Sequence, residues 1–497
     1  TGTAPGGPAD PQTGTTRTPG GASGDTSHCT EDGRQHDVIY NAPPCVPKWT
    51  AGTNNGGATY QGVTKDTIKV LLFRENKNEQ VTFLLNKEGL RATREEDIAF
   101  MEAAERYLND HYELYGRKVD LRIFDATECP ETPPDIPACR AEAQRALKEE
   151  PFAVIWPVPL YPEVFDEFAK AGVISLGGWH FDNSYFAGRR PYRWDVFMDG
   201  TRSVDFIAEY YCKKLANETA SHAGRIIHPS LPNGGARDLQ PRRLGITVPD
   251  DPARVPTAER LKELVSRCDG TEPVIYAFDQ DIERSLQQAS PITQAMIEDR
   301  ITTVTMLSDP IAPIFRTNNQ TRNNYFPEIL MPGLGLHDFD KLGRLYDQQQ
   351  MAHAFGPSHL QVFPDHSETD ASRIWRAADN EGDACQSCNL NGSYFIMMGT
   401  MLQMAGPNLN PATVEQGTLS MEPRGGWEQT GGNPNFVLSA FGPGDYTSLS
   451  DLKEVYWDAG ANSRIDGRPG AYVAMSRGRR WAAGELPSTF DIPVPPR

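Results

Sequence analysis

The cysteines are the residues whose type and spacing could most directly do chemistry. Cys385 and Cys388 form a C-x-x-C motif, and the N-terminus of a helix at such a motif can stabilise a thiolate for dithiol redox catalysis. A polar loop (ADNEGDA) precedes the motif, no predicted strand lies directly before it, and no second C-x-x-C completes a zinc site. We therefore expect a structural disulfide at the start of a helix, with a redox centre as the less favoured alternative.

The other six cysteines also fall into neighbouring pairs along the chain. These pairs are Cys29 with Cys45, Cys129 with Cys139, and Cys212 with Cys268. An even number that pairs locally without a leftover is typical of an exported protein with disulfide bonds. The alternative is a cytosolic protein with eight reduced, buried thiols. The proline-rich loop inside the second pair favours the disulfides.

Other catalytic patterns are missing from the sequence. It contains no G-x-S-x-G, no phosphate-binding G-x-x-x-x-G-K-[ST] and no H-E-x-x-H, so we assign no catalytic residue and no cofactor. The histidines show no paired spacing and no accompanying carboxylate cluster, so we expect no metal site.

Length and charge restrict the class of protein. A chain of 497 residues is long enough for two or three domains. Its net charge of −18 disfavours nucleic acids and anionic membranes as partners. It has no run of 18 apolar residues that could span a bilayer.

The first 60 residues differ from the rest in composition. Residues 1–27 are almost entirely Gly, Pro, Thr, Ser, Ala and Asp, which predicts a flexible leader. Residues 28–60 are also poor in apolar side chains, and the Cys29–Cys45 pair would clamp them into an N-terminal extension. A regular pattern begins at YQGVTKDTIKVLLF (60–73), where residues 68–73 predict a strand buried on both faces. The polar stretch over residues 75–89 predicts a long loop after it.

Helices and strands alternate from there on. The first series has a helix that follows the capping box at residues 93–96, helices near 138–149 and from Pro162, and strands over 119–125, 152–156 and 173–176. The second series has helices near 202–216, 257–267 and 291–300, and strands over 243–248, 273–278, 302–307 and 328–333. This alternation predicts an α/β fold with two parallel sheets covered by helices. A helix over 392–405 and strands around 453–457 and 471–475 follow, and periodicity alone does not place them.

Several segments resemble a known family. GVTKDTIKVLLF, YLNDHYELYGRKVDLRIFD, AGVISLGG and MLQMAGPNLNPATVEQG are similar, in order and spacing, to segments of the type I periplasmic solute-binding proteins. This family includes the branched-chain amino acid and amide receptors of ABC importers. The resemblance runs from about Tyr60 to the C-terminus. It implies two Rossmann-like lobes joined by a three-segment hinge, with residues 61–199 plus 335–440 in lobe 1 and residues 200–334 plus 441–497 in lobe 2.

The resemblance also implies a function and a location. The protein would be an extracytoplasmic receptor, not an enzyme, and its partners would be a small-molecule ligand and the membrane permease of an ABC importer. A lipid anchor just ahead of Thr1 would tether it through the flexible leader.

The predicted sheets indicate where the ligand binds. In open parallel sheets, ligands bind beyond the carboxyl ends of the strands, where loops converge. We expect these loops of the two lobes to face each other across a cleft. The candidate ligand-binding residues are Phe73, Arg74, Trp156, Leu160, Tyr161, Trp179, His180, Phe181, Tyr276, Phe278, Ser308, Asp309, Gly333 and Leu334.

The chemistry of these loops bears on the ligand. Amino-acid receptors of the resembling family hold the ligand carboxylate with Ser or Thr hydroxyls after the third and fourth strands, but here the loops read WPVPLYP and GGWHF, where Tyr161 supplies the only hydroxyl. The aromatic rings favour a ligand with a large apolar or aromatic body, although any one of them could instead fill a lobe core. His180 could donate to a ligand, and a role as a structural donor is the more favoured alternative.

Three functions therefore remain open. The most favoured is a transport receptor for a small molecule. The second is a two-lobed surface assembly or sensor protein that no longer transports, which a cleft plugged by residues 76–92 or 317–327 would favour. The third and least favoured is a dithiol oxidoreductase.

Overall fold

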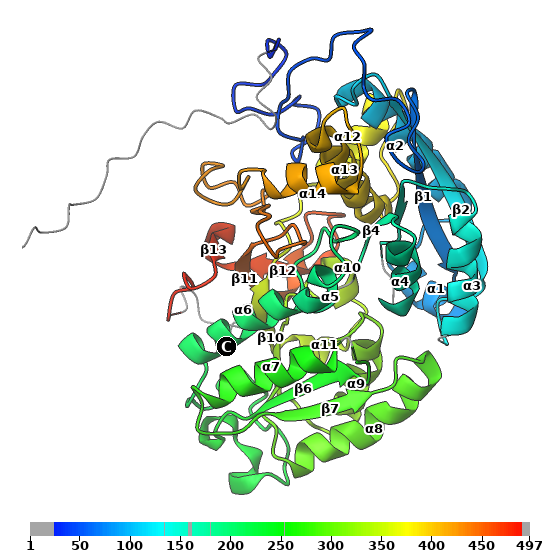
Figure 1. The fold of residues 1–497 in the computed structure, drawn as a ribbon. Helices are drawn as coiled ribbons and strands as arrows, with labels where there is room; N and C mark the ends of the chain where they lie inside the picture. Colours follow the sequence, from blue (N-terminus) through cyan, green and yellow to red (C-terminus); the bar gives the residue numbers. More distant parts are fainter. Residues whose placement is uncertain (1–23, 134, 158–161, 179, 253, 490–497) are drawn as a thin grey trace, which may run out of the picture.

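The chain folds into two α/β lobes (Figure 1). The computed structural model describes residues 24–133, 135–157, 162–178, 180–252 and 254–489. Residues 1–23 of the expected leader and three candidate site residues, Leu160, Tyr161 and Trp179, lie outside the described residues. Alternating helices and parallel strands in both lobes confirm the predicted α/β fold class, and the sheet of lobe 2 carries antiparallel strands in addition.

The sheet of lobe 1 has five parallel strands in the order β2-β1-β3-β4-β5. They are β1 (Thr67–Asn76), β2 (Lys118–Pro130), β3 (Ala153–Ile155), β4 (Ile174–Leu176) and β5 (Arg193–Trp194). Strand β1 matches the predicted buried strand, since Ile68, Val70, Leu71 and Phe73 are all at most 1% exposed. Aliphatic side chains on both faces of β1 let helices cover the sheet from both sides.

Helices from two distant parts of the chain cover this sheet. From the N-terminal part come α2 (Arg94–His111), α3 (Ile136–Leu147), α4 (Pro162–Lys170) and α5 (Asn183–Ala187), whereas Leu84 and Leu85 of α1 (Glu79–Asn86) pack against the core of lobe 2. From the C-terminal part come α12 (Asp370–Ala377), α13 (Cys388–Ala405) and α14 (Pro411–Leu419), and both α12 and α13 pack on α2. Helix α2 begins at the predicted capping box of Thr93 and Glu96. Helix α1 occupies part of the range predicted as a loop, and the Asn78 side chain caps its first turn.

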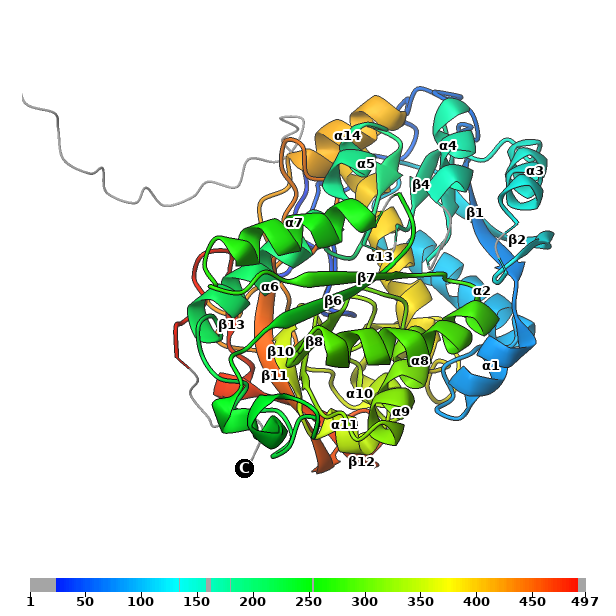
Figure 2. The same ribbon diagram turned by 90° about the horizontal axis from the view of Figure 1, so that it is seen from below.

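Lobe 2 has a larger, mixed sheet in the order β12-β11-β10-β9-β8-β6-β7, with β13 also paired to β11. The parallel strands are β6 (Leu244–Pro249), β7 (Val274–Phe278), β8 (Thr303–Met306), β9 (Glu328–Leu330) and β10 (Ala354–Ser358); the antiparallel ones are β11 (Asp451–Asn462), β12 (Pro469–Ala474) and β13 (Arg480–Ala482). Its helices are α6 (Gly200–Lys214), α7 (Val255–Ser266), α8 (Ile282–Glu298), α9 (Ala312–Arg322), α10 (Asp340–Gly343) and α11 (Gln348–Met351). Figure 2 shows the sheet between α6 and α7 on one face and α8 and α9 on the other.

Lobe 2 departs from the sequence prediction in three places. Helix α8 begins at Ile282 and contains Pro291, although the helix was predicted to start near residue 291. Helix α9 occupies part of the range 317–327, which was treated as a loop. Strand β10 pairs with β9 and β11 in the sheet of lobe 2, although residues 335–440 were expected in lobe 1.

Three chain segments cross between the lobes, as expected for a three-segment hinge. They lie between β5 and α6, between β10 and α12, and just before β11. The first and third run side by side, because the Asp195 amide donates to the Tyr446 carbonyl and the Ser448 amide donates to the Asp195 carbonyl. The Arg480 guanidinium of lobe 2 donates to the carbonyls of His359 and Leu360 in the second crossing segment.

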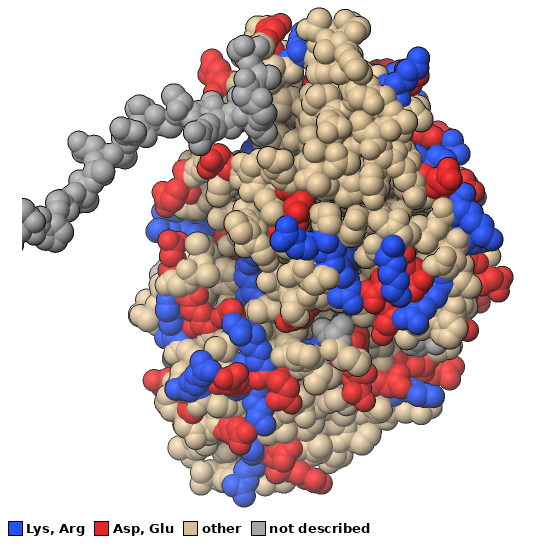
Figure 3. All heavy atoms as spheres, viewed as in Figure 1, with Lys and Arg blue, Asp and Glu red and all other residues tan. Residues whose placement is uncertain are grey.

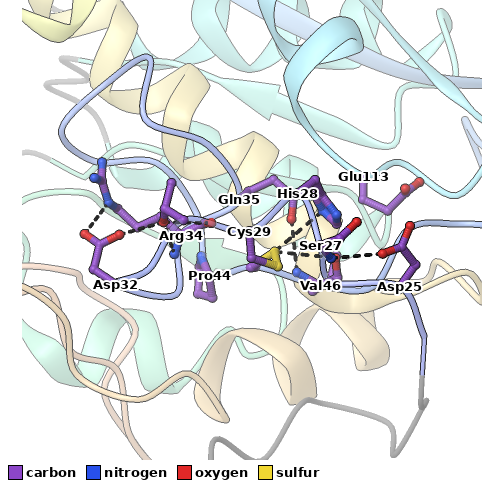
Figure 4. Close-up of a disulfide and its surroundings, with 12 residues drawn as sticks. Asp25, Ser27, His28, Cys29, Asp32, Arg34, Gln35, Pro44, Val46 and Glu113 are labelled. Atoms are coloured by element: carbon purple, nitrogen blue, oxygen red, sulfur yellow. Dashed lines mark hydrogen bonds and ion pairs between the residues drawn. A yellow bond between two sulfur atoms is a disulfide. The ribbon is translucent and has the colours of Figure 1, made fainter.

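All four predicted disulfides are present. They join Cys29 to Cys45, Cys129 to Cys139, Cys212 to Cys268, and Cys385 to Cys388. The first closes the N-terminal extension into a loop that lies against lobe 1 (Figure 4).

Candidate ligand-binding site

A cavity of about 1200 Å³ extends between the two lobes. The carboxyl end of β1 and the residues after β3 contribute to its wall from lobe 1, and the residues after β8 contribute from lobe 2. This is the edge at which parallel sheets bind ligands. Four sequence-predicted residues line the cavity: Phe73, Arg74, Trp156 and Asp309.

Two aromatic rings form part of the lobe 1 wall. The ring centroids of Phe73 and Trp156 lie 4.8 Å apart, and both side chains are almost fully buried. The indole Nε1 of Trp156 donates to Glu75 Oε2 at 2.7 Å. Burial raises the pKa of Glu75, and the nearby charge of Glu131 raises it further. The two rings therefore lie in the wall with only a small part of their surface exposed, and the polar edge of the indole is already hydrogen-bonded.

Charged side chains border this wall. Arg74 Nε lies 2.9 Å from Asp97 Oδ2, Lys77 Nζ lies 3.8 Å from the same oxygen, and Arg91 pairs with Glu131. Burial lowers the pKa of Lys77. Each of these three cations thus has a carboxylate partner, and the Arg74–Asp97 pair holds the end of β1 against α2.

Lobe 2 supplies the opposite wall. Asp309 Oδ1 accepts from the backbone N–H groups of Ile311 (2.7 Å) and Ala312 (3.1 Å), which fixes the loop between β8 and α9. Phe315 on α9 and Phe339 beside α10 line the cavity. Apolar side chains of lobe 2 therefore lie across the cavity from the aromatic wall of lobe 1.

Comparisons with known proteins identify this architecture. No protein-family model and no curated protein sequence matches the chain. Solved structures do match. A solute-binding protein of an ABC transporter from R. palustris, in complex with 4-hydroxybenzoate, has 12% identity and a TM-score of 0.56, over 84% of this chain and 98% of that one. The chain has the type I periplasmic binding-protein fold.

Two further structures of this fold are similar to the chain. A fatty acid ABC transporter substrate-binding protein from Thermomonospora curvata has 11% identity and a TM-score of 0.55, over 86% of this chain and 97% of that one. A possible leucine/isoleucine/valine-binding protein from Rhodopirellula baltica has 11% identity and a TM-score of 0.52, over 82% of this chain and 97% of that one. At this level of identity the likeness concerns the fold.

Seven predicted site residues do not line the cavity. They are His180, Phe181, Tyr276, Phe278, Ser308, Gly333 and Leu334. The Tyr276 hydroxyl donates to Asp299 at 2.7 Å, and the Phe278 ring lies 3.8 Å from the guanidinium of Arg316. Successive side chains of a strand point to opposite faces, so residues at the end of a strand covered on both faces can still point into the core. Being at a strand end therefore does not place a side chain in the cleft.

His180 has a structural partner. Its Nδ1 lies 2.7 Å from the Met198 carbonyl oxygen, which can only accept, so Nδ1 carries the proton. Its ring centroid lies 5.3 Å from that of His359, which does line the cavity. Burial lowers the pKa of His180 to about 4, so the ring is neutral at neutral pH.

The sequence reasoning missed one long wall of the cavity. Helix α13 was predicted, but Ile396, Met397, Met401 and Met404, which lie on the cavity, were not recognised as site residues. They follow one another at intervals of one, four and three residues, which places them on one helical face, and methionine-rich surfaces adapt to apolar ligands. That spacing was the signal available in the sequence.

The cysteine motif and the possible metal ligands have a structural explanation. Cys385 and Cys388 form a disulfide at the start of α13, as predicted. Within the described part of the chain, one group of possible ligands is close enough for a metal, namely His28 with Cys29 and Cys45, and both sulfurs are consumed by their disulfide.

No helix among the described residues is long and apolar enough to cross a membrane.

Proposed function

We propose that the protein is an extracytoplasmic receptor that binds a small solute with an apolar or aromatic body and delivers it to an ABC-type importer. The observation that carries this proposal is the cavity between the lobes, at the carboxyl ends of parallel strands of both sheets, with aromatic and aliphatic walls. The R. palustris structure with this fold holds 4-hydroxybenzoate, and the T. curvata protein is described as a fatty acid transporter component. Both ligands have apolar bodies.

The two walls explain how binding would be coupled to closure. Phe73 and Trp156 belong to lobe 1, whereas Phe315 and Phe339 come from lobe 2. A solute that contacts both sets of side chains favours the closed arrangement by the difference between its affinities for the closed and open forms. The three crossing segments are the natural hinge for this movement.

Charge and cysteine content support the location and the partners. Four disulfides are typical of an extracytoplasmic protein. Acidic and basic side chains are interspersed over much of the face shown in Figure 3, and the net charge is −18, so a nucleic-acid partner is disfavoured. A lipid anchor ahead of the leader would keep such a receptor at the cell surface near its permease.

The other two functions have less support. Residues of the segment 76–92, such as Val81, Leu85 and Leu90, line the cavity but leave about 1200 Å³ of it open, which favours a binding protein over one with a plugged cleft. The Cys385–Cys388 disulfide lies at the start of α13, where Cys388 is buried. An insulin-reduction assay tests the dithiol function, and turnover that a Cys385→Ser variant loses would make the protein an oxidoreductase.

Ligand-induced thermal stabilisation tests the proposed function. The purified protein is first analysed by native mass spectrometry for a co-purified solute, and then melted in the presence of aromatic acids, fatty acids, sterols, amides and amino acids. We expect apolar or aromatic compounds to raise the melting temperature, since a ligand stabilises the state it binds.

Two variants make this test specific to the cavity. Trp156→Ala removes a cavity wall, so it should abolish the ligand-induced shift; Trp375→Ala, on α12 and absent from the cavity lining, should keep it. An unchanged shift in Trp156→Ala, or a response to amino acids alone, would contradict the proposal.

A further inference from the structure

The cavity extends well beyond the cleft, along helix α13. Its lining includes Met397, Met401 and Met404, which share one face of this helix, and Asn391 near the start of the helix, about a third of a turn away from that face. At a rise of 1.5 Å per residue, the 13 steps from Asn391 to Met404 correspond to about 20 Å. The two ends of α13 therefore mark two separate ends of the cavity.

The first turns of α13 lie at the hinge and cleft. The Tyr394 hydroxyl lies 2.7 Å from Asp195 Oδ1 and 2.9 Å from the Pro157 carbonyl, next to the aromatic wall. Asn391 Nδ2 lies 3.3 Å from Asp97 Oδ1, in the charged cluster beside Arg74.

The last turn of α13 lies against the N-terminal extension. Gln403 Nε2 donates to the Pro44 carbonyl at 2.7 Å. The loop that carries Pro44 is closed by the Cys29–Cys45 disulfide and by the Arg34 and Gln35 contacts drawn in Figure 4. It is also tied to α12, because Asp370 accepts from the backbone N–H of Tyr40 at 2.7 Å. The extension thus forms a built end wall of the cavity.

One cation at this end differs from the others that line the cavity. Arg34, Arg74, Lys77 and Arg91 each have a carboxylate oxygen within 4.0 Å. Arg424 has no such partner among the described residues, and its Nη1 donates to the carbonyl of Ala42 at 2.7 Å. Burial lowers the pKa of Arg424 to about 10, so the side chain remains a cation at neutral pH.

We propose that the solute is a long single-chain acid, with its carboxylate on Arg424 beside the N-terminal extension and its chain along α13 toward the cleft. This inference rests on the proposed receptor function and deepens it. Among the cations that line the cavity, a guanidinium without a carboxylate partner gives a ligand carboxylate the largest gain in binding free energy, because it can offer that carboxylate charge-assisted hydrogen bonds. The methionine-rich face of α13 suits a flexible apolar chain.

The size of the cavity also favours a long chain over a compact aromatic acid. A length of about 20 Å accommodates an extended chain of roughly fourteen to sixteen carbons, given C–C bonds of about 1.5 Å. The volume of about 1200 Å³ exceeds the roughly 300–1000 Å³ of ordinary small-molecule sites. A single benzoate ring would leave most of the α13 wall without a contact.

Binding measurements on the full chain test the inference. The probes are palmitate, its methyl ester, octanoate and 4-hydroxybenzoate, measured by calorimetry below their micellar concentrations. We expect palmitate to bind most tightly, and the uncharged ester to bind about ten- to a hundredfold more weakly, as the loss of a charged hydrogen-bond partner implies. Arg424→Gln should weaken palmitate by a similar factor and leave the ester unchanged.

Control variants separate this site from its alternatives. Arg122→Gln removes an exposed arginine of β2 that is paired with Asp120, so it should bind palmitate as the wild type does. Ile396→Trp places a bulky ring on the cavity side of α13, eight residues and about 12 Å from Met404, beyond the reach of an eight-carbon chain, and should weaken palmitate much more than octanoate. The melting temperature of each ligand-free variant checks that it is folded.

The outcomes also distinguish this inference from the proposed function. If Arg74→Gln rather than Arg424→Gln weakens palmitate, the head group lies in the cleft and the inference is wrong. If short aromatic acids bind and palmitate does not, the inference is wrong while the receptor function stands. If no probe binds and no solute co-purifies, both are overturned.

Discussion

Asp195 connects the hinge to α13, and its ionisation should control the stability of this junction. The residue begins the first crossing segment and is fully buried. Its Oδ1 accepts from the Tyr394 hydroxyl at 2.7 Å and from the Phe197 amide at 3.4 Å. Burial raises the pKa of Asp195 to about 7, although these hydrogen bonds and the charge of Arg193 lower it in part.

The direction of the pH effect follows from this pKa. An aspartate in the unfolded chain has a pKa of about 3.9, so the folded state holds the proton more tightly. The stability gained from the protonated carboxyl is present in full below about pH 4 and is lost as the pH rises through about 7. Three pKa units at about 1.36 kcal/mol each give about 4 kcal/mol at pH 8.

Asp195→Asn should therefore stabilise the protein at high pH. An asparagine keeps an oxygen that accepts from Tyr394 but cannot ionise. The buried Arg193 guanidinium keeps other stabilising contacts when the Asp195 charge is removed, because its Nη1 donates to the Ser175 carbonyl at 2.9 Å and the guanidinium lies 3.5 Å from the Phe165 ring. We expect the variant to gain less than about 2 kcal/mol over the wild type at pH 5 and about 4 kcal/mol at pH 8.

Thermal melting at the two pH values measures this difference. For a chain of 497 residues, the usual unfolding entropy converts 1 kcal/mol into a shift of about 1 °C. The gain of Asp195→Asn over the wild type should thus widen by about 2–3 °C between pH 5 and pH 8. Asp37→Asn, at an exposed position of the extension, should show no such widening. A variant that is less stable than the wild type at pH 8, or a gain that does not depend on pH, would refute the reasoning.

Two other perturbations test the framework around the site. Arg242→Ala should destabilise lobe 2 by about 3–5 kcal/mol in urea unfolding, because the buried Glu328 loses a bidentate partner at 2.7 and 2.8 Å. As a control, Arg260→Ala, which removes an ion pair with an exposed partner, should cost less than about 1 kcal/mol. Equal losses of stability in the two variants would contradict the role of burial. Removing the Cys29–Cys45 disulfide with serines should cost about 3 kcal/mol, as expected for a closed loop of this length. An undiminished melting temperature would show that packing alone holds the extension.

Local signals in the sequence predicted much of the fold. Strand β1 is a dense apolar run, and the start of α2 is set by a capping box that depends on residues only three positions apart. The alternation of such elements was enough to predict two lobes with parallel strands, but not the antiparallel strands β11, β12 and β13 that complete the sheet of lobe 2. The prediction of the four disulfides followed from an even number of cysteines that fall into neighbouring pairs along the chain.

The misplaced elements depend on partners that are distant in the sequence. Strand β10 reads AFGPS, so glycine and proline weaken its apolar signal, and its position is set by pairing with β9 and with β11 about 100 residues later. A helix was predicted around residues 291–300, whereas α8 begins nine residues earlier, at Ile282, and accommodates Pro291 in its interior. Whether a residue at the end of a strand faces the cleft or the core likewise depends on tertiary packing. Trp156 therefore lines the cavity, whereas Phe278 does not.

The shape of the cavity has a consequence for closure. Most of the length along α13 is lined by lobe 1 and the extension, and side chains of lobe 2, such as Phe315 and Phe339, come in at the cleft end. A short acid held at Arg424 would touch lobe 1 without reaching lobe 2, so it would have no differential affinity for the closed form. A chain long enough to reach the aromatic wall would contact both lobes and favour closure. In the proposed receptor, selection for chain length would then operate through the hinge, because only a ligand that contacts both lobes favours the closed form.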